Sequence, residues 1–589
     1  MKKILSIAII CAMAMGVNAV PAKRGWQTRT QADGTTIELQ QMGDEYYHYM
    51  INREGQRVRL NEAGMYEVIG NAPTQAQVRA RRAEGQIRRQ RKDFGKTPNL
   101  APKGVVIIVN FSDKSMASGH THTTFDELCN SENCKVNSGY PSAAEYFNSQ
   151  SNGKYRPQFD VFGPVTLSKS YSYYGNNVGD GDDSEDEFAT DAVIEACILA
   201  NEQYPELNFA DYDSDKNGDV DFVYVIYAGY GEADGGGDNT IWPHNWSIQG
   251  LVEGDQYYGD YTKYHKADTK LDGVYLDNYA MSNELDYYNN SLCGIGTLCH
   301  EFGHVMGLPD FYDTNYGTNY SSALTPNDWD VMDGGAYNKD GHCPPNYSPW
   351  EKYFFGWHTP VNLGNKGQVL QLTANGLDGY QAYQINVSGK QQTATTSGEC
   401  YYIENRQQTG WDEGLPYHGM LIWKVNYNAT SWANNSPNNT ANKPLYTIVS
   451  ASGKTIGTHV NSTGTSYVYD GPKNPFPGSK NMIAWQDLDG KPLLDITEKN
   501  GVISLVYIED GGYNVKWIVN GEELENTEYD EGDALVMPTK AVTPCDGTKF
   551  IGWTEEENWH DPFVAPADLF TTAEGKKVTR AATYYAVFQ

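Results

Sequence analysis

Cysteine and basic residues are scarce in this sequence of 589 residues, and long apolar runs are missing beyond its first twenty residues. Nine cysteines and 44 lysines and arginines stand against 75 aspartates and glutamates, for a formal net charge of −31. Such an acidic surface disfavours nucleic acid and anionic membranes and favours divalent cations. No internal stretch approaches the roughly 18 apolar residues of a membrane span. We therefore expect no nucleic-acid partner and no membrane span, and we expect a monomer.

The first residues have the pattern of a secretory signal. Lys2 and Lys3 precede an apolar run from Ile4 to Met15, and the small residue Ala19 follows at a suitable cleavage position. We expect a secreted, extracellular protein, either released or held at the cell surface. Eight cysteines then remain, which allow 105 complete pairings, so no disulfide is assigned.

Residues 20–96 differ in charge from the rest of the chain. They carry 14 lysines and arginines against 9 acidic residues, whereas residues 97–589 carry 28 against 66. Short strands are predicted at Thr35–Leu39, Tyr46–Ile51 and Tyr66–Val68, followed by a basic linker. We interpret 20–96 as a propeptide that acts as an intramolecular inhibitor, with activation cleavage between about Arg79 and Lys96. A harmless linker, with two independently solvated surfaces, is the alternative.

The candidate zinc ligands and general base lie in residues 299–310, whose sequence is Cys-His-Glu-Phe-Gly-His-Val-Met-Gly-Leu-Pro-Asp. At helical spacing His300 and His304 lie on one face and can bind a single zinc ion. Glu301, one residue round the helix, is placed to be the general base for a zinc-bound water. Gly307 can end the helix and turn the backbone, so that Asp310 returns as the third ligand.

Three further residues extend or complicate this zinc site. Glu351, at a predicted helix start, competes with Asp310 for the third ligand position. Met332, in Trp329-Asp-Val-Met332, is predicted to form a Met-turn beneath the metal. Tyr337, five residues later, is a candidate to stabilise the oxyanion, or else a core or loop residue. His244 and His342 are more simply read as ordinary hydrogen-bonded side chains.

A second metal site is predicted before a buried strand. The oxygen-bearing side chains follow the first nine positions of a calcium loop around Gly218. Position twelve would be Tyr224, so the loop is not of EF-hand type, and an acidic turn is the alternative. We expect structural calcium there, bound through Asp213, Asp215, Asn217, Asp219 and Asp221.

Strands and helices alternate through residues 97–359. Gly104–Phe111 and Phe222–Tyr227 are continuous apolar runs typical of buried central strands, and Phe159–Leu167 is a further strand. Ser142–Ser151 and Glu185–Asn201 are predicted helices. This order indicates an α+β zincin catalytic domain, in which a twisted mixed sheet carries a backing helix and an active-site helix near Ser291–Met306.

Helices become scarce after Trp357. Strand-like segments separated by polar loops predict an all-β sandwich at 360–509 and a small β-rich module at 511–589. The strands expected in the sandwich include Val369–Leu372, Cys400–Ile403, Met420–Tyr427 and Val502–Ile508. The loop Asn428–Lys443 is polar and is expected to be mobile.

With these residues in view, the chain resembles the immune inhibitor A-type metallopeptidases over about residues 20–509. The resemblance implies extracellular endopeptidase activity, zinc, structural calcium and a β domain packed on the catalytic domain. The last unit resembles a Listeria–Bacteroides repeat through Lys549–Trp553 and Tyr585–Phe588. The motifs that carry the first resemblance are Gly43–Glu45, Ser142–Phe147, Ser151–Lys154, Asp219–Asp221, Trp242–His244, His300–Asp310, Trp329–Met332, Ile403–Arg406 and Gly410–Trp411.

The predicted function is therefore zinc-dependent hydrolysis of peptide bonds in extracellular proteins by a zymogen, with Glu301 as general base. Two alternatives stay open. One is a surface protein that binds ligands through its β modules and keeps a relict metal site. The other is a zinc amidase of narrow specificity, which cleavage of a protein substrate would separate from an endopeptidase.

Overall fold

The computed structural model describes residues 21–589 except 24, 62, 75, 79, 82–99, 178–185, 253–261, 315–324, 365–366, 441–442, 452–474, 489, 508–512, 530–531, 545–546 and 558–564. The predicted signal at 1–19 and most of the predicted activation segment therefore lie outside the described residues. None of the helices in the described part of the chain is long and apolar enough to cross a membrane.

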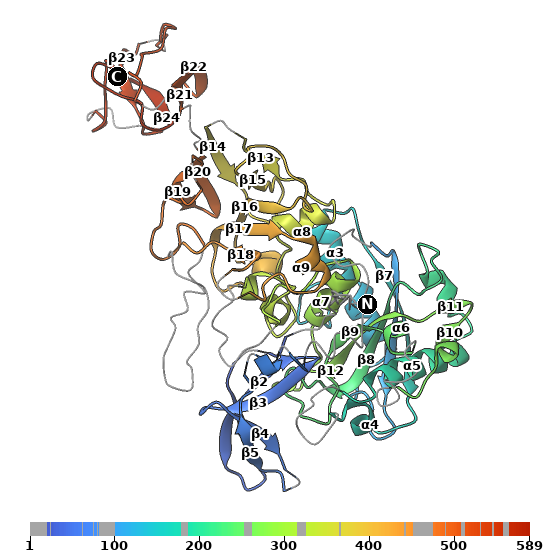
Figure 1. Ribbon diagram of the computed structural model, residues 1–589. Helices are drawn as coiled ribbons and strands as arrows, with labels where there is room; N and C mark the ends of the chain where they lie inside the picture. Colours follow the sequence, from blue (N-terminus) through green and yellow to red (C-terminus); the bar gives the residue numbers. More distant parts are fainter. Residues whose placement is uncertain are drawn as a thin grey trace, which may run out of the picture.

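A mixed five-stranded sheet forms the centre of the region from 100 to 359 (Figure 1). Its order is β7 (Gln158–Thr166), β6 (Lys103–Asn110), β8 (Val223–Tyr230), β12 (Asn278–Leu285) and β9 (His244–Ser247). The first four strands pair in parallel, and β9 is antiparallel at the edge. The two predicted apolar runs are β6 and β8, whose side chains are buried on both faces, as parallel strands require.

Helices cover both faces of this sheet. Alternate residues of β6 divide between two cores: Val105 and Ile107 pack with α5 (Ala189–Gln203), whereas Val106 and Ile108 pack with α3 (Ala143–Gln150) and α7 (Gly296–Val305). The mixed α+β character expected from the sequence is confirmed. The remaining helices here are α2 (His122–Asn130), α4 (Tyr171–Gly175), α6 (Gln249–Val252) and α8 (Pro349–Phe354), and β10 (Lys270–Leu271) pairs with β11 (Val274–Tyr275).

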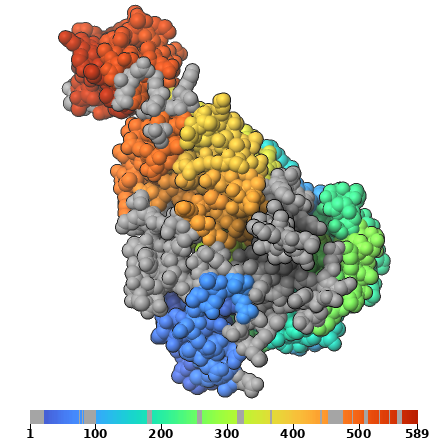
Figure 2. Space-filling view, viewed as in Figure 1, coloured from blue at the N-terminus to red at the C-terminus, as the bar shows by residue number. Residues whose placement is uncertain are grey.

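The N-terminal region forms an antiparallel sheet, called the N-terminal sheet below. Where the sequence predicted three strands there are five: β1 (Gln27–Thr30), β2 (Thr36–Asp44), β3 (Tyr47–Asn52), β4 (Gln56–Leu60) and β5 (Tyr66–Asn71). The sheet lies at one end of the molecule, beside β12, and is coloured blue in Figures 1 and 2. Its β3 is buried along its whole length because it packs against the α/β region.

Two facing sheets follow residue 360 and share one apolar core. The first holds β13 (Val361–Asn362), β15 (Tyr383–Ile385), β16 (Gly398–Arg406), β17 (Gly419–Tyr427) and β18 (Tyr446–Ile448); the second holds β14 (Gln368–Leu372), β20 (Val502–Tyr507) and β19 (Leu493–Lys499). The other face of the first sheet, with Tyr402 and Trp423, joins the core that contains α7. The β region and the metal helix therefore share a core.

The expectation of a mobile loop at Asn428–Lys443 is wrong for the residues that the structure describes. This segment contains α9 (Ala429–Ala433), and Trp432, Asn435 and Asn438 are fully buried. Asparagine side chains that bond the backbone allow such a polar segment to be buried without leaving polar groups unsatisfied.

The last module is a four-stranded sheet at the opposite end of the molecule from the N-terminal sheet (Figure 2). Its strands are β21 (Tyr513–Val519), β22 (Glu522–Tyr529), β23 (Phe550–Thr554) and β24 (Ala582–Phe588). Trp517 and Trp553 pack edge to face in its core, with ring centroids 4.7 Å apart.

The seven cysteines in the described part of the chain are all free thiols. Cys197 and Cys299 are fully buried. Cys545 lies outside the described residues.

A buried ion-pair network fastens the β region to the α/β region. Arg406 bonds both carboxylate oxygens of Asp412 at 2.7 Å and Glu404 at 3.1 Å, and none of the three is exposed. Arg406 also donates to the carbonyl oxygen of Asn346, whose own N–H donates to Asp412. Arg406 thus joins β16 to the segment before α8.

Replacing Arg406 with methionine is expected to lower the free energy of unfolding by about 3–5 kcal/mol, because two carboxylates would lose their buried counter-charge. The matched control is Lys339→Met, which removes an ion pair to Glu413 between half-exposed groups at 3.4 Å. That change should cost about 0–1 kcal/mol. Urea unfolding followed by tryptophan fluorescence would compare the two, and equal effects would contradict the role given to Arg406.

Candidate metal centre

The predicted His-Glu-x-x-His motif lies in helix α7, inside the protein core. Every residue from Leu298 to Val305 is buried, so the chain here is helical without a solvated face. Glycine is required at 296, because a β-carbon there would lie 1.8 Å from the carbonyl oxygen of Ala336. The helix ends at Gly307, whose φ of +105° suits glycine and turns the chain back toward Asp310.

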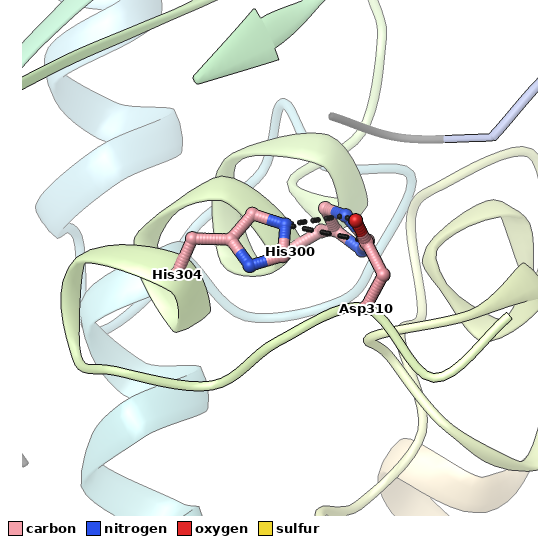
Figure 3. A group of neighbouring side chains, drawn as sticks. All are labelled: His300, His304 and Asp310. Carbon is pink, nitrogen blue, oxygen red and sulfur yellow. Dashed lines mark hydrogen bonds and ion pairs between the residues drawn. The ribbon is translucent and has the colours of Figure 1, made fainter. Parts of the chain in front are cut away.

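Three side chains meet at one point beside this helix (Figure 3). The Nε2 atoms of His300 and His304 are 3.0 Å apart. Oδ1 of Asp310 lies 3.3 Å from the first and 3.4 Å from the second. All three residues are fully buried. Among the described residues, this is the one group of three histidine, cysteine or carboxylate side chains close enough together to hold a metal ion.

Backbone carbonyls orient both imidazoles. Nδ1 of His300 lies 2.7 Å from the carbonyl oxygen of Val331, and Nδ1 of His304 lies 2.8 Å from that of Leu308. Because a carbonyl only accepts, each Nδ1 carries the proton and each Nε2 directs its lone pair toward the other. Oδ1 of Asp310 adds a third lone pair and has no hydrogen-bond donor among the residues that the structure describes. A cation is the group that satisfies all three atoms.

The shifted pKa values of the three groups also indicate that positive charge is favoured between them. Burial alone would lower the pKa of His300, but Asp310 and Glu301 raise it to about 9. Burial lowers the pKa of His304 to about 4. Burial would raise the pKa of Asp310, yet the two imidazoles lower it to about 2. A proton and a metal ion therefore compete for one position, and two imidazoles with a carboxylate are a donor set suited to zinc.

An asparagine from the β region holds Asp310 in place. Nδ2 of Asn435 donates to Oδ2 of Asp310 at 2.6 Å, and the N–H of Asp310 donates to Oδ1 of Asn435, also at 2.6 Å. This leaves Oδ1 of Asp310 free to face the imidazoles. The neighbouring Asn438 donates to the carbonyl oxygen of Phe311. Sequence reasoning missed both, although the asparagine-rich run from 434 to 439 was a signal of backbone-bonding side chains.

Met332 packs against α7 at Gly303, and its role in a Met-turn stays a prediction. Its sulfur would be 2.5 Å from a β-carbon on Gly303, so glycine at this position lets the turn approach α7 closely. The same turn supplies the carbonyl of Val331 that orients His300.

The two residues predicted to be catalytic, Glu301 and Tyr337, lie in α7 and in a short helix that packs against it. Glu301 is fully buried in α7, and its charge contributes to the raised pKa of both His300 and Tyr337. Tyr337 ends the short helix η4 (Gly334–Tyr337), which packs against α7. Its hydroxyl donates to the carbonyl oxygen of Pro21 at 2.8 Å.

The other residues considered from the sequence lie elsewhere. Glu351 closes a capping box at the start of α8, where its carboxylate accepts from the N–H of Ser348, and it does not join the three ligands. His244 bonds the Trp242 carbonyl and the Tyr279 hydroxyl. His342 bonds the side chain of Asn137. The structure gives both histidines structural partners.

The predicted calcium loop follows the short helix η1 (Phe209–Tyr212). Its carboxylates accept N–H groups of their own loop: Asp213 from Asn217 and Gly218, and Asp221 from Ser214. Burial and neighbouring carboxylates raise the pKa of Asp221. Among the described residues, no three carboxylates of this loop gather at one point. Calcium binding by Asp213, Asp215, Asn217, Asp219 and Asp221 stays a prediction.

Two buried imidazoles with a carboxylate, on a helix that also carries a glutamate, are the kind of donor set found in zinc peptidases. Comparison with known families gives the particular class: residues 101–362 match the immune inhibitor A peptidase M6 catalytic domain. This part of the chain is similar to that family, in agreement with the resemblance found in the sequence.

Two curated relatives agree. An "Immune inhibitor A" of Bacillus thuringiensis subsp. alesti is 30% identical over 232 residues, which cover 36% of this chain and 31% of that protein. A "Pre-pro-metalloprotease PrtV" of Vibrio cholerae serotype O1 is 29% identical over 235 residues, which cover 36% of this chain and 23% of that protein. The match thus spans less than a third of the length of either relative.

Asn435 provides a test of the geometry. Replacing it with glycine removes the amide that holds Asp310, while glycine tolerates the φ of +49° at this position. Residues that orient a ligand in this way usually contribute 10- to 100-fold to metal affinity. We expect Asn435→Gly to weaken zinc binding by about that factor in a competition titration with a chromogenic chelator.

The control for this variant is Asn481→Gly. Asn481 has a similar φ of +51° but is exposed and bonds neither ligand. Its zinc affinity should equal that of the unchanged protein. If both asparagine variants bind zinc as tightly as the unchanged protein, Asn435 does not support the ligand set.

Proposed function

We propose that this chain is a secreted zinc endopeptidase made as an inactive precursor. The observation that carries the proposal is the convergence of His300, His304 and Asp310 at one buried point, next to Glu301. The match to a peptidase M6 catalytic domain supports peptide-bond hydrolysis. Export rests on the signal-like first residues, and a precursor form is named for one of the relatives.

The proposed chemistry uses three kinds of group. A zinc ion held by the two imidazoles and the carboxylate would act as a Lewis acid and lower the pKa of a water molecule to about 7. Glu301 accepts a proton from the attacking water and later donates it to the leaving amine. The hydroxyl of Tyr337 donates a hydrogen bond to the carbonyl oxygen of the substrate as negative charge develops there.

Contacts of the N-terminal region support its role as an inhibitory propeptide. The Pro21 carbonyl accepts the hydroxyl bond of Tyr337, and Ala22 packs against Tyr337 and Ala336. Tyr312, two residues after Asp310, lies in an apolar cluster with residues of β2 and β3. The N-terminal region therefore contacts both the proposed oxyanion donor and the segment that follows the third proposed ligand.

A buried ion pair adds to this contact. Nε2 of His48 lies 3.0 Å from Oε2 of Glu232, and both side chains are at most 2% exposed. The imidazole also stacks on Trp242 at 4.4 Å between ring centroids. Burial alone would lower the pKa of His48, but Glu232, with a smaller effect of Asp186, raises it to about 9.

Cleavage of casein tests the proposed function. Protein lacking residues 1–19 should cleave little casein until limited trypsin treatment nicks the linker, and a zinc chelator should abolish the cleavage. Glu301→Gln should lower the rate after the nick by about 100- to 10,000-fold, the usual contribution of a general base. The variant should still bind zinc, because Glu301 is not one of the three ligands.

The outcomes separate this proposal from its rivals. No cleavage by nicked, zinc-loaded protein would favour the ligand-binding protein or the narrow amidase. Full activity of Glu301→Gln would exclude the proposed base. Activity equal before and after the nick would leave an endopeptidase but exclude the inhibitory role of residues 20–96.

The His48–Glu232 pair predicts a pH dependence of propeptide release. A pKa raised above the usual 6.5 means that the pair stabilises docking fully below about pH 6.5 and loses this contribution as the pH rises through about 9. After the linker is nicked, the propeptide should therefore dissociate faster above pH 9 than at neutral pH. Gel filtration of nicked Glu301→Gln protein at both values measures the fraction released.

The control is His48→Gln in the same background. Because glutamine does not titrate, release should be faster at neutral pH and should change less between neutral pH and pH 9. An unchanged pH dependence in His48→Gln would show that another group controls docking.

Two further parts of the proposal rest on sequence pattern. The acidic loop at 213–221 is proposed to bind structural calcium. The module at 511–589 is proposed to be a Listeria–Bacteroides-type repeat that binds a surface or a partner, because it carries no cluster of metal-ligating or nucleophilic side chains among its described residues.

A further inference from the structure

A small acidic pocket lies beside the first turn of α7. Three loops form it: the segment after β8 supplies Asp234, the segment between β12 and α7 supplies Asp286, and the segment after η4 supplies Asp340. Thr297 of α7 and Tyr337 complete the part of the wall that faces the metal helix.

Lys23 of the N-terminal region lies against two of the carboxylates that line this pocket. Its ammonium nitrogen lies 2.8 Å from Oδ2 of Asp286 and 3.5 Å from Oδ1 of Asp340. It also lies 4.8 Å from the centre of the Tyr288 ring, within the range of a cation–π contact. The Lys23 side chain is only 16% exposed. Three groups of the protein thus contact one lysine side chain.

The backbone around Lys23 is held as a bound peptide would be. The N–H of Lys23 donates to the carbonyl oxygen of Ala233 at 2.9 Å. Two residues earlier, the Pro21 carbonyl accepts from the hydroxyl of Tyr337 at 2.8 Å. These bonds use backbone atoms that every peptide has, so only the side chain in the pocket is specific to lysine.

The pocket holds more negative charge than one lysine neutralises. Asp234 is 6% exposed; its Oδ2 accepts two long bonds of 3.3 Å, and its Oδ1 has no hydrogen-bond donor among the described residues. Burial and the neighbouring Asp286 raise the pKa of Asp234 to about 7, against the opposing effect of Lys23. Removal of the N-terminal region would take the ammonium of Lys23 away from these carboxylates, so they would favour a new cation.

The pocket lies close to Glu301, the proposed general base. Thr297 is one helical turn before Glu301, and residues four apart lie on the same face of a helix about 6 Å apart. Tyr337 forms another part of the pocket wall, and the charge of Glu301 contributes to its raised pKa. Because successive residues of an extended peptide are about 3.3 Å apart, a side chain in the pocket belongs to a residue within about two positions of the scissile bond.

We propose that this pocket is the main specificity pocket of the active enzyme, that it selects substrates with lysine or arginine next to the cleaved bond, and that Lys23 closes it in the precursor. The inference rests on the proposed endopeptidase function. A guanidinium, with five N–H donors, would reach Asp286 and the free oxygen of Asp234 together, so arginine should be accepted as well as lysine.

The first experiment measures substrate preference. Full-length protein is activated with trypsin, the trypsin is blocked with a serine-protease inhibitor, and Glu301→Gln treated in the same way gives the background. Peptides that differ at one position only, as lysine, arginine, norleucine or glutamate, are then compared by kcat/KM. Lysine and arginine should be preferred over norleucine by about tenfold or more, as for hydrogen bonds to a charged group.

Asp286→Asn should reduce the ratio of lysine to norleucine cleavage by about tenfold, because the 2.8 Å charged contact is lost. The ratio is the informative quantity, since misfolding or loss of zinc would lower both rates alike. Asp495→Asn is the matched control: it removes an exposed carboxylate that pairs with Arg580, and it should leave the ratio unchanged.

The second experiment uses binding rather than catalysis. A fluorescent peptide that copies residues 20–24 is titrated into activated Glu301→Gln protein, together with the same peptide carrying norleucine in place of lysine. The lysine peptide should bind at least tenfold more tightly, and Asp286→Asn should remove this difference.

Each outcome decides the proposal. Active enzyme that cleaves all four peptides alike, or an unchanged ratio in Asp286→Asn, would overturn the specificity pocket and leave the endopeptidase intact. Zinc-loaded protein that cleaves neither peptides nor casein would overturn both.

Discussion

The structure depends on bringing three lone pairs to one buried point. Nε2 of His300, Nε2 of His304 and Oδ1 of Asp310 meet there, and all three side chains are fully buried. Such an arrangement is unfavourable unless a cation occupies the centre, so the surrounding structure has to hold it in place. Two backbone carbonyls fix the imidazoles, Asn435 fixes the carboxylate, and Gly303 lets the Met-turn pack beneath.

This support comes from the whole molecule rather than from the motif. The α/β region supplies the helix, and the β region supplies Asn435 and, through Arg406, the link that keeps its first sheet against the same core. The N-terminal region contacts the remaining side through Pro21 and Lys23. The β region is therefore part of the metal centre, and its loss should affect the centre directly. Among its described residues, the N-terminal region contributes no side chain to the group of three ligands.

Sequence patterns predicted the parts of this structure that depend on local chemistry. Continuous apolar runs gave β6 and β8, and the spacing of His300, His304 and Asp310 gave the group of side chains that the structure brings together. Other parts escaped because their signals are not local. Strand β12 carries buried polar residues such as Glu284, which accepts backbone N–H groups from Gly229 and Ala117, so it shows no apolar alternation. Asn435 lies 125 residues from Asp310 in a segment whose composition resembles a loop. Lys23 is one of many basic residues near the N-terminus, and only the fold shows which carboxylates it meets.

The most direct test of the central claim is a crystal structure of zinc-soaked protein with data collected at the zinc absorption edge. The account predicts an anomalous peak about 2.0–2.2 Å from Nε2 of His300, Nε2 of His304 and Oδ1 of Asp310. Glu351 should stay in its capping box, away from the peak. A zinc peak bound by other residues, or no peak at this point in protein saturated with zinc, would contradict the proposed metal centre and the hydrolytic function built on it.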